Sequence, residues 1–260
     1  MTYKPFDLTG KVALITGGNG GIGLGFAEAV AAAGAHVCIW GTNKEKSAAA
    51  LERLKTHGTQ VSASLCNVAD EKQVENGFQE ALKEFGRVDA CFANAGVSGK
   101  AGSFLEISAE EWNRVIGVNL TGAFYTFRAA ARHMVERAKN NDPGGRLIGT
   151  ASLAAISGAA RNEQYAASKG GMVSMIKALA VEFARYGVTA NAILPGWIET
   201  DMTEGAFNWK KFADAVLPRI PVRRWGRPDD FGAVAVYLMS DASVYHSGQS
   251  FCIDGGYLVY

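Results

Sequence analysis

The chain has 260 residues, of which 48% are apolar and 20% are charged. A chain of this length forms one large domain or two small ones, and it can bury a core without disulfide support. The 26 Lys and Arg residues nearly balance the 25 Asp and Glu residues. This composition excludes a disordered chain and argues against nucleic acid or an anionic membrane surface as a partner.

Targeting and metal signals are missing from the sequence. The N-terminal residues lack an apolar h-region, and no uncharged stretch has the length and polarity of a membrane span, so we expect a cytoplasmic protein. Cys38, Cys66, Cys91 and Cys252 are far apart, each in an apolar, strand-like run, which predicts buried free thiols in a reducing compartment. The four histidines show no ligand spacing, so no metal site is predicted.

Short β-branched runs alternate with longer helical patterns along the chain. The predicted strands are residues 11–16, 36–40, 60–66, 87–93, 145–152, 188–194 and 250–254. The predicted helices are residues 21–34, 44–57, 70–85, 108–139 (one helix or two), 162–186 and 229–240. The strands are continuous apolar runs, which is typical of parallel strands covered on both faces. The alternation predicts one α/β domain over residues 1–260, with a doubly wound, seven-stranded parallel sheet flanked by helices.

Residues 201–224 depart from this rhythm. They separate the sixth strand from the last helix and carry Phe207, Trp209 and Phe212. A long connection with several aromatic residues favours a mobile substrate lid, and a packed insertion is the alternative.

A glycine-rich loop, TGGNGGIG at residues 16–23, follows the first strand and opens the first helix. Glycine lets the backbone turn sharply and approach a pyrophosphate, while the helix N-terminus offers free N–H groups and a positive dipole end. No G-K-[S/T] follows, which disfavours a P-loop. The loop predicts a Rossmann-type dinucleotide site, with a tight turn that binds nothing as the alternative.

The end of the second strand bears on the choice of cofactor. The stretch from Trp40 to Lys44 lacks the acidic residue that would hold the ribose 2′-hydroxyl of NAD. Thr42, Asn43 and Lys44 could instead donate hydrogen bonds to a 2′-phosphate. The predicted cofactor is therefore NADP or NAD, with NADP favoured.

Three further residues suggest acid–base chemistry. Tyr165 and Lys169 stand at i and i+4 in a predicted helix, and Ser152 ends the fifth strand at the sheet edge that faces the crevice. A free Tyr has a pKa of about 10, which a neighbouring ammonium and a cationic nicotinamide ring would lower. Tyr165 is thus predicted as the general acid or base for a carbinol/carbonyl pair, with Ser152 bonding the substrate oxygen and Lys169 reaching ribose hydroxyls.

Together these residues resemble the short-chain dehydrogenase/reductase family, from Lys11 to Tyr257. The ordered matches are Thr16, Gly17, Gly21 and Gly23 in the glycine loop, Asn94, Ala95 and Gly96 after the fourth strand, Asn119 in a helix, Ser152, Tyr165 and Lys169, and Pro195, Gly196, Ile198 and Thr200. Two positions depart from the family pattern. Ala93 replaces the first residue of the usual N-N-A-G, and Asn67 stands where an Asp is usual near the adenine.

The resemblance implies a role for each matched position. Asn119 would hold a water that joins Lys169 to solvent, which makes the predicted catalytic set Asn119, Ser152, Tyr165 and Lys169. Asn94 would support the active-site backbone and the adenosine ribose side, while Ile198 and Thr200 would hold the carboxamide. The predicted cofactor-binding residues are Gly17, Asn19, Gly21, Ile22, Gly23, Thr42, Asn43, Asn67, Val68, Asn94, Gly96, Tyr165, Lys169, Pro195, Gly196, Ile198 and Thr200. Gly20 stands where NADP-dependent members often carry a basic residue, which weighs against NADP.

The loops at this sheet edge set the substrate. They are mostly small and apolar, which predicts a medium-sized ketone or secondary alcohol, and Arg161 or Lys100 could meet an anionic group. A loose basic cluster near the lid leaves a 3-oxoacyl thioester on acyl carrier protein open as a substrate. The cluster comprises Lys210, Lys211, Arg219, Arg223 and Arg224.

Two other functions fit the sequence less well. A non-catalytic nucleotide-binding member of the fold predicts loss of the Tyr/Lys pair, which is present. A serine hydrolase would need a G-x-S-x-G elbow, and the sequence has none. The family resemblance further implies a homotetramer.

Overall fold

A parallel sheet runs through the centre of the computed structural model, which describes residues 4–100 and 102–260. Its seven strands lie in the order β3-β2-β1-β4-β5-β6-β7, and every neighbouring pair is parallel. The strands are β1 (Val12–Thr16), β2 (His36–Gly41), β3 (Val61–Leu65), β4 (Ala90–Ala93), β5 (Gly145–Thr150), β6 (Val188–Pro195) and β7 (Ser250–Ile253). The predicted single-domain, doubly wound fold is confirmed.

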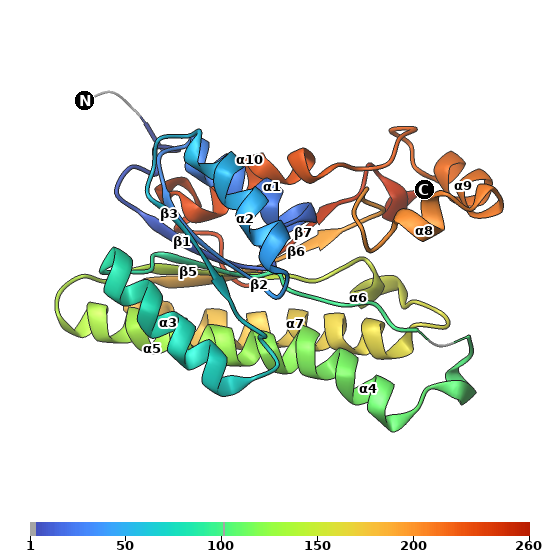
Figure 1. Ribbon diagram of the computed structural model, residues 1–260, viewed down its shortest axis with the longest axis horizontal. Coiled ribbons are helices and arrows are strands. Elements are labelled where there is room, and N and C mark those ends of the chain that lie inside the picture. Colours follow the sequence, from blue (N-terminus) through green and yellow to red (C-terminus); the bar gives the residue numbers. More distant parts are fainter. Residues whose placement is uncertain (1–3, 101) are drawn as a thin grey trace.

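Helices cover both faces of the sheet (Figure 1). One face carries α1 (Gly21–Ala32), α2 (Lys44–Lys55) and α10 (Gly232–Met239), and the other carries α3 (Glu71–Phe85), α5 (Gly122–Lys139) and α7 (Glu163–Glu182). The other α-helices are α4 (Ala109–Ile116), α6 (Ala154–Ser157), α8 (Glu204–Phe207) and α9 (Lys210–Val216). A π-helical turn, η2 (Gly117–Thr121), joins α4 to α5. Of the one or two helices expected over 108–139, the structure has two, joined by this π turn.

Local sequence signals set several helix ends. Asp70 caps α3 by accepting hydrogen bonds from the backbone N–H groups of Lys72 and Gln73, and Gly86 ends the helix at a φ of 76°. The start of α1 differs, because Gly20 offers no capping side chain and the first turn contains no acidic residue. The first amides of α1 therefore keep their capacity to bind an external anion.

Side chains from alternate faces of the strands fill two apolar cores. Phe78 and Phe127 lie in the core under α3, α5 and α7, and Phe26 and Phe231 lie in the core under α1, α2 and α10. The central strands are buried on both faces, as predicted. The edge strands β3 and β7 have only one neighbour each and are partly exposed, which the continuous apolar pattern did not indicate.

The exposure of β7 corrects one prediction. All four cysteines are free, and Cys38, Cys66 and Cys91 are buried as expected. Cys252 is exposed, because it lies on the outermost strand of the sheet.

The topology fixes where a ligand can bind. Strand order reverses between β1 and β4, which lie side by side and end at Thr16 and Ala93. In open parallel sheets, the crevice outside the carboxyl ends at such a switch point is the usual ligand site. Within residues 4–100 and 102–260, none of the helices combines the length and the apolar character that a membrane crossing requires.

Candidate active site

The glycine loop turns at the carboxyl end of β1. Gly17 and Gly21 have φ values of 63° and 49°, which favour glycine. A Cβ on Gly23 would lie 2.2 Å from the carbonyl oxygen of Gly17, so no larger residue fits there. The loop therefore brings bare backbone and the uncapped start of α1 to the crevice.

Thr16 ties this loop to the end of β4. Its Oγ1 accepts hydrogen bonds from the backbone N–H groups of Asn94 and Ala95, both at 3.0 Å. The Asn94 side chain donates to the carbonyl oxygens of Thr16 at 3.1 Å and Gly17 at 3.3 Å. These bonds supply the backbone support expected of Asn94, and its contact with a ribose stays a prediction.

The predicted adenosine end of the crevice lies at the start of α2. The Asn19 amide nitrogen donates to the carbonyl oxygen of Asn43 at 3.3 Å and to Ser47 Oγ at 3.0 Å. Asn19 covers Gly41, where a Cβ would lie 2.1 Å from its nitrogen. The side-chain oxygen of Asn43 caps α2 by accepting a hydrogen bond from the N–H of Lys46 at 2.8 Å. Only its amide N–H groups remain for a ligand.

At the expected adenine site, a side-chain oxygen is likewise already engaged within the protein. Asn67 Oδ1 accepts from the backbone N–H of Ala69 at 3.1 Å, which leaves its amide nitrogen as the group that could meet an adenine edge. Val68 is 5% exposed, and a Cβ on Gly122 would lie 2.7 Å from its side chain. Val68 can therefore offer little besides its backbone.

The segment after β6 forms the opposite wall. The carbonyl oxygen of Pro195 accepts from the N–H of Leu153 at 3.1 Å, which holds the Ser152 loop beside β6. Gly196 packs against Asp254, where a Cβ would come within 2.7 Å. Both contacts keep the backbone around the predicted nicotinamide position in close register.

Thr200 faces the glycine loop across the crevice. A Cβ on Gly21 would lie 3.1 Å from the Thr200 methyl group. Thr203 fixes this turn, since its Oγ1 accepts from the Thr200 N–H at 3.0 Å and donates to the carbonyl oxygen of Ile198 at 2.5 Å. Ile198 is 4% exposed, so its side chain packs inside the protein.

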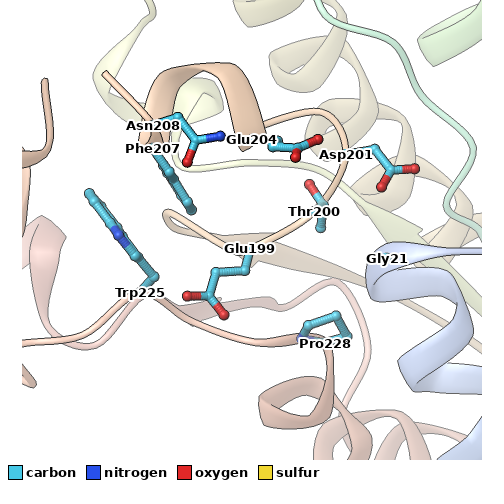
Figure 2. Close-up of a pocket in the computed structure, with 9 residues that line it drawn as sticks. All are labelled: Gly21, Glu199, Thr200, Asp201, Glu204, Phe207, Asn208, Trp225 and Pro228. Carbon is cyan, nitrogen blue, oxygen red and sulfur yellow. The ribbon is translucent and has the colours of Figure 1, made fainter. Parts of the chain in front are cut away.

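A cavity of about 540 Å³ opens behind this wall (Figure 2). Its floor includes Gly21 and Thr200, and the rings of Phe207 and Trp225 stack along one side at 4.0 Å with 7° between their planes. Tyr165 does not line it. The cavity therefore lies beside the cofactor wall rather than at the predicted catalytic residues.

Tyr165 and Lys169 share one face of α7, as their spacing predicts. The Lys169 Nζ lies 5.5 Å from the centre of the Tyr165 ring. Lys169 is 3% exposed and donates a 2.7 Å hydrogen bond to the carbonyl oxygen of Thr150 at the end of β5. Burial lowers the pKa of Lys169 to about 8.

The pKa of Tyr165 moves against the sequence-based prediction. Burial raises the pKa of the phenol, and a hydrogen bond with Ser152 opposes that rise. The Lys169 ammonium, which was expected to lower this pKa, is instead directed to Thr150 and is disfavoured by its own burial. The lowering predicted from an adjacent ammonium is therefore wrong for the chain by itself.

Asn119 lies in the π turn η2 and joins three segments. Its Oδ1 accepts from the Val97 N–H at 2.8 Å, and its amide nitrogen donates to the Val97 carbonyl at 3.0 Å and to Ser168 Oγ at 3.1 Å. Ser168 in turn donates to the carbonyl oxygen of Tyr165 at 2.7 Å. A Cβ on Gly96 would lie 3.4 Å from Asn119 Oδ1 and 3.5 Å from Lys169 Nζ. The structure thus gathers Asn119, Gly96 and the catalytic helix at one point.

The comparisons with known proteins agree with this geometry. Residues 17–258 match the family model described as enoyl-(acyl carrier protein) reductase. The 3-oxoacyl-[acyl-carrier-protein] reductase FabG of Chlamydia pneumoniae is 36% identical over 249 residues, which covers 96% of this chain and 97% of that protein. The chain belongs to the short-chain dehydrogenase/reductase family. It is accordingly an NAD(P)-dependent oxidoreductase of the type that acts on CH–OH and keto groups.

Other members of the family are equally similar to this dehydrogenase/reductase. The 5-keto-D-gluconate 5-reductase of Escherichia coli K12 is 35% identical over 254 residues, covering 98% of both chains. Among solved structures, a gluconate 5-dehydrogenase from Burkholderia cenocepacia in complex with NADP and tartrate superposes with a TM-score of 0.91 at 32% identity, covering 98% of both chains.

Sequence reasoning missed three supporting residues of this short-chain dehydrogenase/reductase. Thr16 was seen only as part of the glycine motif, and Ser168 and Thr150 were not singled out. Ser168 meets a partner 49 positions away, and the Thr150 carbonyl meets one 19 positions away. Such contacts leave no periodicity in the sequence. The Tyr-x-x-Ser-Lys spacing, which puts Ser168 on the inner face of the helix, was the one available signal.

Proposed function

We propose that this protein interconverts a small ketone and a secondary alcohol with NADP, using Tyr165 as the general acid/base. The convergence of Tyr165, Ser152 and Lys169 at the carboxyl end of β5, across from the glycine loop, carries this proposal. Asn119 supports the constellation from η2.

The crevice fits a dinucleotide. The uncapped start of α1, the positive φ of Gly17 and Gly21, and the lack of room for a Cβ at Gly23 form a cradle for a diphosphate. When bound, the cofactor supplies or accepts a hydride at the carbinol carbon. The lack of an acidic residue between Gly41 and Lys44 supports NADP, as does the NADP in the related gluconate 5-dehydrogenase structure.

In the reducing direction, Tyr165 donates its phenolic proton to the substrate oxygen. Ser152 positions that oxygen through a hydrogen bond and also stabilises the phenolate that remains. Lys169, with a pKa of about 8, is mostly charged at neutral pH and would reach the ribose hydroxyls of the cofactor. The positive charge that favours the phenolate would come from the oxidised nicotinamide ring. Asn119 and Ser168 hold the first turn of α7 so that these groups stay aligned.

A polyhydroxylated ketone is the substrate that the relatives and the site favour. The relatives include a 5-keto-D-gluconate 5-reductase and the sorbose reductase of Schizosaccharomyces pombe, which is 38% identical over 264 residues. Polar groups also lie in the loop after β4 that we expect to border the substrate, where Asn162 donates to Ser98 Oγ at 3.0 Å and accepts from the Gly99 N–H at 2.9 Å. Hydroxyl-rich substrates suit such a rim better than an acyl chain does.

A 3-oxoacyl thioester reductase is the second candidate, because FabG is 36% identical. Docking of an acidic carrier protein requires free cations at the mouth. Lys210 pairs with Asp214, Arg224 pairs with Asp230, and Arg219 stacks on the ring of Tyr257. Because carboxylates lie beside two of the five cations in the cluster, it offers less net positive charge to an acidic carrier protein, which supports the small ketone.

We extend the proposal to the lid, the assembly and the compartment. Residues 201–224 act as the lid, with Trp209 exposed at 60% toward solvent while Phe212 packs edge-on against Trp197 at 5.0 Å.

Exposed apolar side chains on the outer faces of α5 and α7, Phe124 and Val181, support a homotetramer, which light scattering tests. A cytoplasmic location remains our expectation from the reduced cysteines.

Replacing Tyr165 tests the proposed chemistry. Tyr165→Phe should keep cofactor affinity and lose about 10²–10⁴ in kcat for ketone reduction, because the phenol supplies the proton. Tyr186→Phe, in the 3₁₀ turn Ala184–Tyr186 that follows α7, is the control and should keep its activity. Activity is followed by nicotinamide absorbance over ketoses, keto acids and 3-oxoacyl thioesters with both cofactors. Near-normal turnover of Tyr165→Phe would contradict the proposal.

A further inference from the structure

An ion pair between Lys46 and Asp201 crosses the cofactor crevice. Lys46 lies in the first turn of α2, and Asp201 follows Thr200 at the start of the 201–224 segment. The two side chains are 155 positions apart in the chain, so no local pattern shows the contact. The pair links the adenosine end of the crevice to the wall opposite the glycine loop.

The glycine loop lies between the two ends of this link. Asn19 reaches one side by donating to the carbonyl oxygen of Asn43 at 3.3 Å, and Gly21 meets Thr200 on the other. A dinucleotide on this loop places its adenosine ribose beside the end of β2, where α2 begins. Lys46 in the first turn of α2 therefore lies on the element that begins where the ribose 2′-position is expected.

We propose that Lys46 is shared between Asp201 and the 2′-phosphate of NADP, so that Asp201 competes with this phosphate and limits the preference for NADP over NAD. The inference rests on the proposed function for its ligand. The Lys46 side chain is 53% exposed and that of Asp201 is 79% exposed, so neither is locked in place. Exposed ion pairs are weak, which makes an exchange of partners easy.

The strength of such a pair sets the size of the effect. Measured exposed pairs correspond to changes of about twofold to fivefold in an equilibrium constant. A 2′-phosphate carries more charge than one carboxylate and offers several acceptor oxygens, so it should win Lys46 from Asp201. NAD, with a neutral 2′-hydroxyl, leaves the pair intact.

Glu204 provides a matched control. It lines the same cavity as Asp201 and lies close to it along the cavity rim (Figure 2). Neutralising either residue removes one negative charge near the phosphate, but Lys46 pairs with Asp201. Glu204→Gln therefore measures the through-space charge effect, and any excess in Asp201→Asn reports the competition.

Calorimetric titration of NADP and NAD tests the inference without turnover. Asp201→Asn should bind NADP about twofold to fivefold more tightly and NAD unchanged, while Glu204→Gln should show a smaller change. Lys46→Met should weaken NADP binding at least about tenfold, and adding Asp201→Asn to it should then raise NADP affinity no more than Glu204→Gln does. Equal tightening of both cofactors, or a gain in NADP affinity that stays above that of Glu204→Gln in the Lys46→Met background, would overturn the competition.

The same titrations separate this inference from the proposed function. A protein that binds NADP and shows these differences but reduces no ketone overturns the proposed function and supports the competition. The wild type could instead bind NAD more tightly than NADP. If Asp201→Asn then reduces this difference in affinity, and does so only when Lys46 is present, the NADP preference is wrong and the competition stands. A protein that binds neither cofactor overturns both.

Discussion

Replacing Lys169 with Met should raise stability near neutral pH while removing catalysis. Lys169 is 3% exposed, and burial lowers its pKa from 10.5 to about 8. Since one pKa unit corresponds to about 1.4 kcal/mol, the buried ammonium costs the folded state roughly 3 kcal/mol at neutral pH. The variant also leaves the Thr150 carbonyl without its donor, at a cost of about 1–3 kcal/mol. The net expected gain in the free energy of unfolding is about 1 kcal/mol.

The stability difference between wild type and Lys169→Met should depend on pH in one direction. As the pH rises through about 8, folded Lys169 loses its proton while the unfolded side chain keeps it up to about 10.5. The unfolded state then binds more protons, so wild-type stability should rise by about 2 kcal/mol relative to the variant between about pH 7 and 9.5. The Cys38 thiol, whose pKa burial raises to about 11, acts oppositely but equally in both proteins.

Urea denaturation followed by tryptophan fluorescence measures this difference across that pH range. Lys177→Met is the control, because Lys177 lies exposed on the same helix and should follow the wild type. If the free energies of unfolding of wild type and Lys169→Met differ by the same amount at all pH values, Lys169 has no lowered pKa and the reasoning fails.

Two further substitutions test how the site is supported. Gly23→Ala should weaken dinucleotide binding at least about tenfold, because its Cβ would lie 2.2 Å from the Gly17 carbonyl and displace the loop; Gly170→Ala, whose Cβ meets nothing within 4 Å, should bind normally in the same titration. Ser168→Ala should lower kcat about tenfold and shift its pH profile with little change in cofactor affinity, since Asn119 and the Tyr165 carbonyl lose their shared partner. An unchanged kcat and pH profile would assign Ser168 no positioning role.

The fold was largely readable from the sequence because each signal was local. Strand–helix alternation and the glycine loop depend on residues a few positions apart, and both have their expected structures. Position in the sheet is not local. Whether a strand is central or at an edge depends on the order of all seven strands, and this is why Cys252 was expected to be buried.

In the candidate site too, the features set by local spacing could be predicted, and those set by distant surroundings could not. Motif spacing placed Tyr165 and Lys169 on one face of α7, because helix geometry fixes that relation. The electrostatics depended instead on the surroundings of the ammonium, which burial and the Thr150 carbonyl determine. Since burial raises the pKa of Tyr165 in the chain alone, the phenol can give up its proton near neutral pH only with help from a positive charge brought by the cofactor. In the proposed role of Tyr165 as general acid/base, loss of its proton is thereby coupled to the oxidised, positively charged nicotinamide ring, which hydride transfer forms in the reducing direction.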